Sequence, residues 1–250
     1  MQEIQSVCVV GAGAIGSLFA GHLGEVAQIK VLTRREEHAA LLNARGLKVR
    51  GKSALHANIR AATDPSALGA VDLLIIATKA TAVEDSAKLI AGHFPSATVM
   101  TVQNGLGCEA VVARHGNWPI ISAVTFMSGV RHSDTEVEYE LDTATWMGPW
   151  AGGKASYADV QQVAALIERS GLKAKAFPDL LPAQWSKLLF NSCVNSIGAL
   201  TDLPHVQAFA RREKLTDLGH LVHAMMAEGR QVAGALGIEL YRDPWAMNVE

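Results

Sequence analysis

A glycine turn lies near the start of the chain, between a strand pattern and a helix pattern. Residues 6–10 read SVCVV, which predicts a fully buried strand, and the overlapping VVGAGAIGSLFAG supplies Gly11, Gly13 and Gly16. In a βαβ unit, such glycines permit a tight turn, let a pyrophosphate approach the backbone, and let helix and strand pack closely. The alternative is a glycine-rich turn with no ligand. The context favours a dinucleotide bound by the whole turn: Gly11, Ala12, Gly13, Ala14, Ile15 and Gly16.

Apolar runs alternate with helical patterns through the first part of the chain, which is typical of a parallel sheet. Three further buried strands are expected at 29–34, 71–79 and 97–105. Residues 47–51 (LKVRG) and 54–63 (ALHANIRAAT) predict two more strands, joined by a turn near Gly51, as an insertion into the repeating pattern.

The pattern changes in the middle of the chain. Residues 136–148 (EVEYELDTATWMG) alternate between polar and apolar side chains, which predicts a half-exposed antiparallel strand and hence a mixed sheet. A helix at about 155–170 and a strand at 172–177 follow. We therefore expect a Rossmann-type α/β domain with a mostly parallel sheet over residues 1–178.

Residues 179–250 predict an all-α domain. Pro182 suits the first turn of a helix at about 183–199 that ends near Gly198. A second long helix is expected at about 205–236, closed by Gly237.

Composition narrows the class of partner. The net charge is -2 with 18% charged residues and no basic run, which argues against nucleic acid and membrane surfaces and favours a small molecule.

Residues 4–24 contain no Asp, Glu, Lys or Arg, a length that could be mistaken for a membrane span, but five glycines and His22 interrupt them, and no signal-peptide pattern is present. The three scattered cysteines fit a reducing compartment, so we expect a cytoplasmic protein. His220 and His223 lack a third ligand, and no metal site is predicted.

The end of the second strand predicts which dinucleotide is bound. An acidic side chain there would accept hydrogen bonds from the ribose 2′-hydroxyl of NAD. The chain instead has Thr33, Arg34 and Arg35, and a guanidinium suits the 2′-phosphate of NADP. The alternative is a solvated pair of arginines facing Glu36 and Glu37. We expect NADP(H), with Arg34 at its 2′-phosphate.

Two more polar residues end predicted strands. Lys79 ends LLIIATKA, and Asn104 follows TVQ at the start of a glycine-rich turn. Ligands of open α/β sheets bind at the carboxyl ends of the strands. Together with the glycine turn, these residues predict a cofactor site at one edge of the sheet, although either could be an ordinary strand-end residue.

Residues 185–195, WSKLLFNSCVN, place three polar side chains on one stripe of an otherwise apolar helix. Lys187, Asn191 and Asn195 follow at four-residue steps. The alternative is a lysine whose stem packs on apolar surface beside two amides that bond to a neighbouring helix. A rigid stripe of one cation and two amides is suited to holding a polar substrate.

The glycine turn, Arg34, Lys79, the QNGLG around Asn104 and the segment WSKLLFNSCVNSIGAL together resemble the ketopantoate reductase (2-dehydropantoate 2-reductase) family. The resemblance covers nearly the whole chain and is most specific in the Lys-xxx-Asn-xxx-Asn helix. It implies NADPH-dependent reduction of ketopantoate to pantoate, on the route to pantothenate and coenzyme A. It also implies an active site in a cleft between a Rossmann domain and a helical substrate domain.

The resemblance implies roles for individual residues. Lys187 matches the proton donor and, with Asn191 and Asn195, binds the substrate. A protonated lysine can stabilise and then neutralise the negative charge that develops on the ketone oxygen. Lys79, Asn104 and Gly129 match positions that line the nicotinamide half of the cofactor site.

The chain departs from the family in two places. The family's helical domain continues beyond a segment such as WAMNVE, where this chain stops, so the second domain is expected to be cut short. Asn248 matches an asparagine just ahead of a substrate-binding serine, and is expected to bind substrate. His205 stands where the family often has an asparagine for the hydroxymethyl end of the substrate.

Two alternatives to ketopantoate reduction stay open. The departure at His205 allows reduction of another branched 2-keto acid. The other alternative is a non-catalytic regulator that binds NADP, since a Rossmann domain alone does not make a catalyst. The resemblance also suggests a homodimer that pairs through the helical domain.

Overall fold

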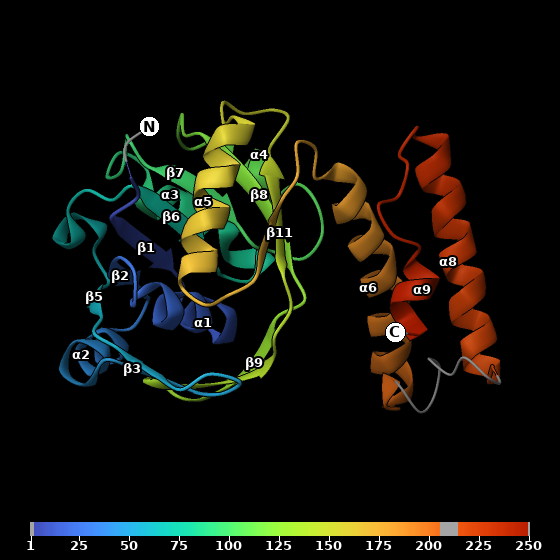
Figure 1. Cartoon of the computed structure of the whole chain (residues 1–250), viewed down its shortest axis with the longest axis horizontal. Coiled ribbons are helices and arrows are strands. Elements are labelled where there is room, and N and C mark those ends of the chain that lie inside the picture. Colours follow the sequence, from blue (N-terminus) through green and yellow to red (C-terminus); the bar gives the residue numbers. More distant parts are fainter. Residues whose placement is uncertain (1–2, 206–214, 250) are drawn as a thin grey trace. The chain divides into compact units, whose positions relative to one another are not determined.

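The computed structural model describes residues 3–205 and 215–249, which form two compact units. The first unit extends to Leu180 and the second begins at Leu181. Figure 1 shows an α/β unit, coloured blue to yellow, and a unit of helices in orange and red. The predicted fold class, a Rossmann-type region followed by helices, is confirmed.

The main sheet of the first unit has eight strands in the order β12-β11-β8-β7-β6-β1-β2-β5. Six neighbouring strands, from β8 to β5, run parallel, whereas β11 runs antiparallel to β8 and carries β12 alongside it. The sheet is therefore mixed, as the sequence predicts. Its strands are β1 (Ser6–Val10), β2 (Gln28–Leu32), β5 (Arg60–Ala62), β6 (Leu73–Ile76), β7 (Thr98–Thr101), β8 (Ile120–Thr125), β11 (Thr145–Pro149) and β12 (Ala174–Ala176).

A second sheet of four strands has the order β4-β3-β10-β9. Its strands are β3 (Leu47–Gly51), β4 (Leu55–Ala57), β9 (Ser128–Ser133) and β10 (Glu136–Leu141). The strand predicted at 136–148 is wrong as a single element, because the chain leaves the second sheet after Leu141 and enters the main sheet at Thr145. Residues 54–63 likewise divide between β4 and β5. The predicted turn after Gly51 is confirmed, with φ at +93°.

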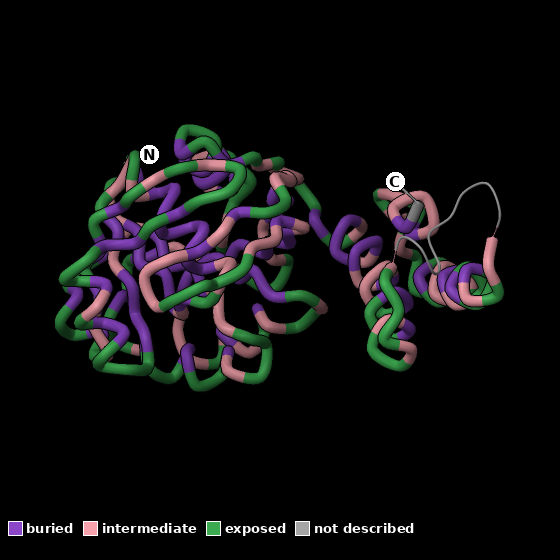
Figure 2. Tube along the Cα trace, turned by 90° about the horizontal axis from the view of Figure 1, so that it is seen from below, coloured by how far each residue is buried: buried purple, intermediate pink, exposed green. Residues whose placement is uncertain are grey.

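Helices cover both faces of the main sheet, which explains why its central strands are apolar throughout. In β1, Val7 and Val9 face one hydrophobic cluster, whereas Cys8 and Val10 face the other. Figure 2 shows these buried stretches gathered inside the unit. The helices of this unit are α1 (Ala14–Leu23), α2 (Glu36–Arg45), α3 (Val83–Ile90), α4 (Cys108–Ala113), α5 (Tyr157–Arg169) and the short 3₁₀ turns η1 (Pro65–Leu68) and η2 (Ala80–Ala82).

Helix α1 lies between the two sheets and contacts both. A Cβ at Gly21 would lie 2.4 Å from Val49 of β3, and one at Gly24 would lie 2.7 Å from Ala57 of β4. This burial explains why α1 carries no charged residue. Within the described part of the chain, no helix is long and apolar enough to cross a membrane.

The second unit contains α6 (Leu181–Thr201), α8 (Asp217–Ala235) and α9 (Pro244–Val249), and both α8 and α9 pack on α6. Its small core consists of Cys193, Val194, Ile197, Val222 and Met226. Helix α6 begins with a proline in its first turn, as predicted, but continues through Gly198 to Thr201, and Asp202 ends it with φ at +53°.

The predicted helix at 205–236 is wrong as a single helix. Residues 215–216 are not helical, and α8 begins after Thr216, whose hydroxyl accepts a hydrogen bond from the Gly219 N–H at 3.0 Å. Residues 206–214 of the predicted helix lie outside the described residues. Gly237 ends α8 with φ at +71°, as predicted.

Candidate active site

The glycine turn joins β1 to α1 and contains glycines of two kinds. A Cβ at Gly11, where φ is +94°, would lie 2.7 Å from the Thr78 methyl group, and one at Gly16 would lie 2.0 Å from the Gly11 carbonyl oxygen. A Cβ at Gly13 would meet nothing within 4 Å. The fold therefore requires glycine at the first and third positions but leaves open space over Gly13, as the approach of a pyrophosphate needs.

The N-terminus of α1 is suited to an anion. Gly13 is the N-cap residue, no side chain caps the helix, and its first turn contains no acidic residue. The unpaired N–H groups and the helix dipole at such an end favour a phosphate. Ala12, Ala14 and Ile15 fill the rest of the turn, and none of their side chains is polar.

The loops after β6 and β7 contain the other residues predicted at this edge. Lys79 is the N-cap of η2, and Asn104 begins the turn after β7; both are exposed. The structure thus brings them to the carboxyl ends of neighbouring strands, at the same edge as the glycine turn.

Sequence reasoning missed Gln103, which lies beside Asn104. The Gln103 amide nitrogen donates hydrogen bonds to the carbonyls of Ile76, at 2.7 Å, and Thr78, at 3.0 Å. Thr78 is the residue against which the first glycine of the turn packs. Gln103 therefore fixes the loop after β6 against the glycine turn. Nothing in the local sequence signals this role, because the two carbonyls belong to the end of β6 and to the loop after it.

The end of β2 contains a cluster of charged residues that we call the arginine corner: Arg34, Arg35, Arg131 and Asp134. Arg34 is exposed and forms no ion pair within the described part of the chain. Arg35 pairs with Asp134 at 2.5 Å, and Arg131 contacts the same carboxylate oxygen at 3.3 Å. The alternative that Arg35 faces the neighbouring glutamates is wrong, because its partner lies in the turn between β9 and β10.

Gly129 lies in β9, within the second sheet. A Cβ there would lie 2.4 Å from the Glu138 carbonyl oxygen of β10 and 3.0 Å from Leu18. The pairing of the two strands against α1 is thus sufficient to explain glycine at this position. Its predicted role beside the nicotinamide stays a prediction.

The predicted stripe lies on α6 in the second unit. The Lys187 side chain is 5% exposed, Asn191 is half-buried and Asn195 is exposed, so exposure rises along the stripe. Burial lowers the pKa of Lys187 to about 8. A lysine with such a pKa can release its proton near neutral pH, which an ordinary surface lysine cannot do.

Asn248, on α9, is 2% exposed, and its side-chain oxygen lies 2.7 Å from Nε2 of His205. The ring of His205 also meets the ring of Phe190 edge-on, with centroids 6.0 Å apart. The structure therefore brings His205, where the sequence departs from the resembled family, into contact with Asn248, which matches that family. The bond assigns Nε2 of His205 as the donor, since the amide oxygen can only accept.

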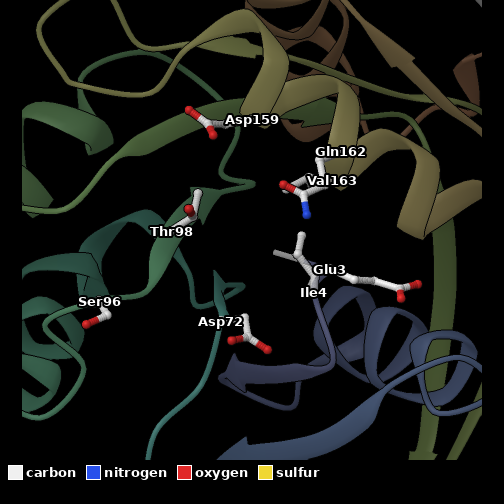
Figure 3. Close-up of a pocket in the computed structure, with 8 residues that line it drawn as sticks. All are labelled: Glu3, Ile4, Asp72, Ser96, Thr98, Asp159, Gln162 and Val163. Carbon is white, nitrogen blue, oxygen red and sulfur yellow. The ribbon is translucent and has the colours of Figure 1, made fainter. Parts of the chain in front are cut away.

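A cavity of about 170 Å³ lies at the opposite edge of the main sheet, near the first residues of its strands (Figure 3). Its carboxylates are already engaged: Asp72 with the start of β1, Asp159 with the N-cap of α5, and Glu3 with Arg169. Ligands of such sheets bind at the carboxyl ends of the strands, so this cavity is not the predicted site. Among the described residues, no group of His, Cys, Asp and Glu could hold a metal ion.

Two family descriptions match the chain. Residues 7–152 match "Ketopantoate reductase PanE/ApbA", and residues 179–250 match "Ketopantoate reductase PanE/ApbA C terminal". The strand order and the glycine turn define a Rossmann-type α/β protein that continues into a helical unit. With these matches, the chain belongs to the ketopantoate reductase family.

Named relatives are similar over most of the chain. The 2-dehydropantoate 2-reductase of Pyrococcus horikoshii is 31% identical over 198 residues, which are 79% of this chain and 64% of the relative. That of Halobacterium salinarum is 31% identical over 202 residues, 79% of this chain and 66% of the relative. The chain thus spans about two thirds of the length of these curated relatives.

Solved structures share the fold. The crystal structure of 2-dehydropantoate 2-reductase from Geobacter metallireducens has a TM-score of 0.83 and 26% identity, and the match covers 98% of this chain and 82% of that one. D-mandelate dehydrogenase, solved with NADH and anilino(oxo)acetate, has a TM-score of 0.86 at 20% identity and covers 98% of this chain and 79% of that one. The second likeness concerns the fold alone.

Proposed function

We propose that the protein reduces 2-dehydropantoate (ketopantoate) to pantoate with NADPH, as a step toward pantothenate and coenzyme A. Membership of the ketopantoate reductase family supports the substrate. The observation that carries the reaction type is the buried Lys187, with its lowered pKa, at the head of a stripe that includes Asn191 and Asn195.

NADPH rather than NADH is proposed as the cofactor. The open space over Gly13 and the uncapped start of α1 suit a pyrophosphate in either case. A protein of similar fold was solved with NADH, so the fold alone does not choose between the two. Arg34 supports NADPH, because it is exposed at the end of β2 without an ion-pair partner in the described part of the chain.

The proposed proton transfer follows from the burial of Lys187. When bound, NADPH supplies the hydride that reduces the keto carbon. The Lys187 ammonium donates a hydrogen bond to the keto oxygen, stabilises the negative charge that develops there, and gives it a proton from Nζ. The products are a 2-hydroxy acid and a neutral lysine. A pKa of about 8 leaves the lysine charged at neutral pH and lowers the cost of giving up the proton.

The two asparagines of the stripe have a positioning role in this proposal. Because Asn191 and Asn195 lie one and two turns beyond Lys187, their amides can hold polar groups of the substrate in register with the lysine. Lys79 and Asn104 are proposed to bind the nicotinamide half of the cofactor, since they lie in the loops after β6 and β7, at the same edge of the sheet as the glycine turn.

A second candidate substrate, another branched 2-keto acid, is favoured by the bond between His205 and Asn248. This bond takes up one of the two acceptor lone pairs of the Asn248 amide oxygen, and it joins Asn248 to the residue at which the sequence departs from the resembled family.

The first test measures NADPH consumption by the full chain with ketopantoate and with a panel of branched 2-keto acids. We expect turnover to fall at least about 100-fold in Lys187→Ala while NADPH binding is kept. Lys154→Ala, at an exposed lysine of the first unit, is the control and should not change the rate. Tight NADPH binding with no turnover on any acid would contradict the reductase and favour a non-catalytic regulator.

A further inference from the structure

The turn between β9 and β10 is fixed to the end of β2 by side chains that come from a distant part of the sequence. The Asp134 backbone carbonyl accepts a hydrogen bond from Nε2 of His38 at 2.9 Å. The Thr33 hydroxyl bonds to Nδ1 of the same ring at 3.1 Å. His38 is 3% exposed, and burial lowers its pKa, so the ring is neutral. These bonds hold the turn that carries Asp134 near the end of β2, the part of the fold where the ribose 2′ group of a dinucleotide is expected.

An aspartate at this place would ordinarily favour NADH. A carboxylate at the end of the second strand accepts bonds from the 2′-hydroxyl and repels a 2′-phosphate. Here the carboxylate comes from another element, and Arg35 and Arg131 both contact it. Three guanidinium groups against one carboxylate give the arginine corner a net charge of +2. The arginine corner thus contains a carboxylate of the kind found in NAD sites, but the charges of Arg35 and Arg131 neutralise it.

We propose that Asp134 is a specificity-determining residue for the cofactor, and that Arg35 acts on specificity by neutralising it. In this arrangement Arg35 is occupied by Asp134, and Arg34 is the guanidinium that meets the 2′-phosphate. The proposal rests on NADPH as the proposed cofactor, and it assigns different roles to two adjacent arginines.

The two roles predict different responses to mutation. Removal of Arg35 leaves Asp134 with Arg131 alone, at the longer distance of 3.3 Å, so the carboxylate would repel a phosphate. Neutralising Asp134 in the same protein should then restore phosphate binding. If Arg35 instead bound the phosphate directly, the loss would persist, because its guanidinium is absent from both variants.

The experiment measures the dissociation constants of NADPH and NADH for the full chain. We expect Arg35→Gln to weaken NADPH about tenfold and to change NADH less than about twofold. The double variant Arg35→Gln with Asp134→Asn should recover NADPH affinity to within about threefold of the wild type. An equal loss in the single and double variants would overturn the proposal.

Two controls separate this proposal from simpler explanations. Glu37→Gln changes the net charge as Asp134→Asn does, but Glu37, in the first turn of α2, is not the carboxylate with which Arg35 pairs, so this change should not rescue Arg35→Gln. If Glu37→Gln restored NADPH affinity as well as Asp134→Asn does, the recovery would be due to net charge alone, which would contradict a specific role for Asp134. Circular dichroism of each variant identifies any loss of folding.

The cofactor proposal itself is tested by other measurements in the same series. Arg34→Gln should remove the preference for NADPH whether or not Asp134 is neutralised. A wild-type chain that binds NADH as tightly as NADPH would refute the proposed cofactor. A wild-type preference for NADPH with no rescue by Asp134→Asn would refute only the role of Asp134.

Discussion

Replacement of Lys187 by methionine should stabilise the protein at neutral pH while it abolishes turnover. Lys187 is 5% exposed, and burial lowers its pKa from the ordinary 10.5 to about 8. The folded protein therefore binds the proton of this lysine more weakly than the unfolded chain does. Methionine has a similar length and no charge, so it fills the same space without this penalty.

The sign and size of the effect follow from linkage. Between pH 8 and 10.5 the unfolded chain keeps a proton that the folded chain has lost, so wild-type stability rises with pH in this window. Below about pH 8 the full penalty applies, and a fall from 10.5 to about 8 at ~1.4 kcal/mol per pH unit corresponds to about 3 kcal/mol. Lys187→Met should gain up to that amount at pH 7 and lose the gain above pH 10.5.

The assay is urea denaturation at pH 7, 8.5 and 10, followed by tryptophan fluorescence. Trp185 on α6 and Trp245 on α9 lie in the helical unit and report on it. Leu188→Met, next to the lysine on α6, is the control and should show a stability difference that does not vary with pH. The substitution also removes the contacts of the ammonium, which changes the stability by an amount that is not part of this argument. The critical result is therefore how the stability difference varies with pH. A difference between Lys187→Met and wild type that stays constant from pH 7 to 10 would refute the argument.

Other outcomes concern rate and cofactor binding. The kcat/KM for keto acid reduction should fall as the pH rises through about 8, because Lys187 then loses the proton that it is proposed to donate; a pH profile that stays flat to pH 10 would contradict this. Gly16→Ala should lower the free energy of unfolding by at least about 2 kcal/mol, since its Cβ would lie 2.0 Å from the Gly11 carbonyl. Gly13→Ala should keep the melting temperature but weaken NADPH about tenfold, which calorimetry and titration can separate. Gln103→Leu should raise the KM for NADPH more than it lowers kcat, because it frees the loop after β6.

Local signals in the sequence are sufficient to predict the main elements of the fold. The glycine spacing and the apolar run of β1 predict the first βαβ unit, because both depend on residues within one turn of each other. The division of residues 136–148 could not be predicted in this way. The first four residues of β10 alternate between half-buried and buried, whereas the first four residues of β11 are all buried, and only the tertiary structure places the two strands in different sheets. The helix start at Thr216 is different, since a threonine N-cap is a local signal that the sequence does contain.

The sequence allows candidate side chains to be named, but it does not indicate which residues they contact. Lys187 is recognisable because a lysine stands at regular spacing from two asparagines in an apolar helix. The partner of Arg35 is not recognisable, because Asp134 lies 99 residues away in the chain. The bonds of Gln103 likewise join the segment after β7 to the end of β6 and the loop that follows it. Contacts of this kind depend on the order of strands and on the second sheet, which hydrophobic periodicity does not encode.

The enclosure of α1 by two sheets affects how fast and how tightly an anion can bind at its N-terminus. Its amide protons can exchange with solvent only when the packing on β3 and β4 opens as well, so they should be among the slowest in the first unit. A helix with so little freedom does not need to be ordered by a ligand. The loss of conformational entropy is therefore incurred when the protein folds, and the backbone N–H groups at Gly13 are already in position for the phosphate that is proposed to bind there.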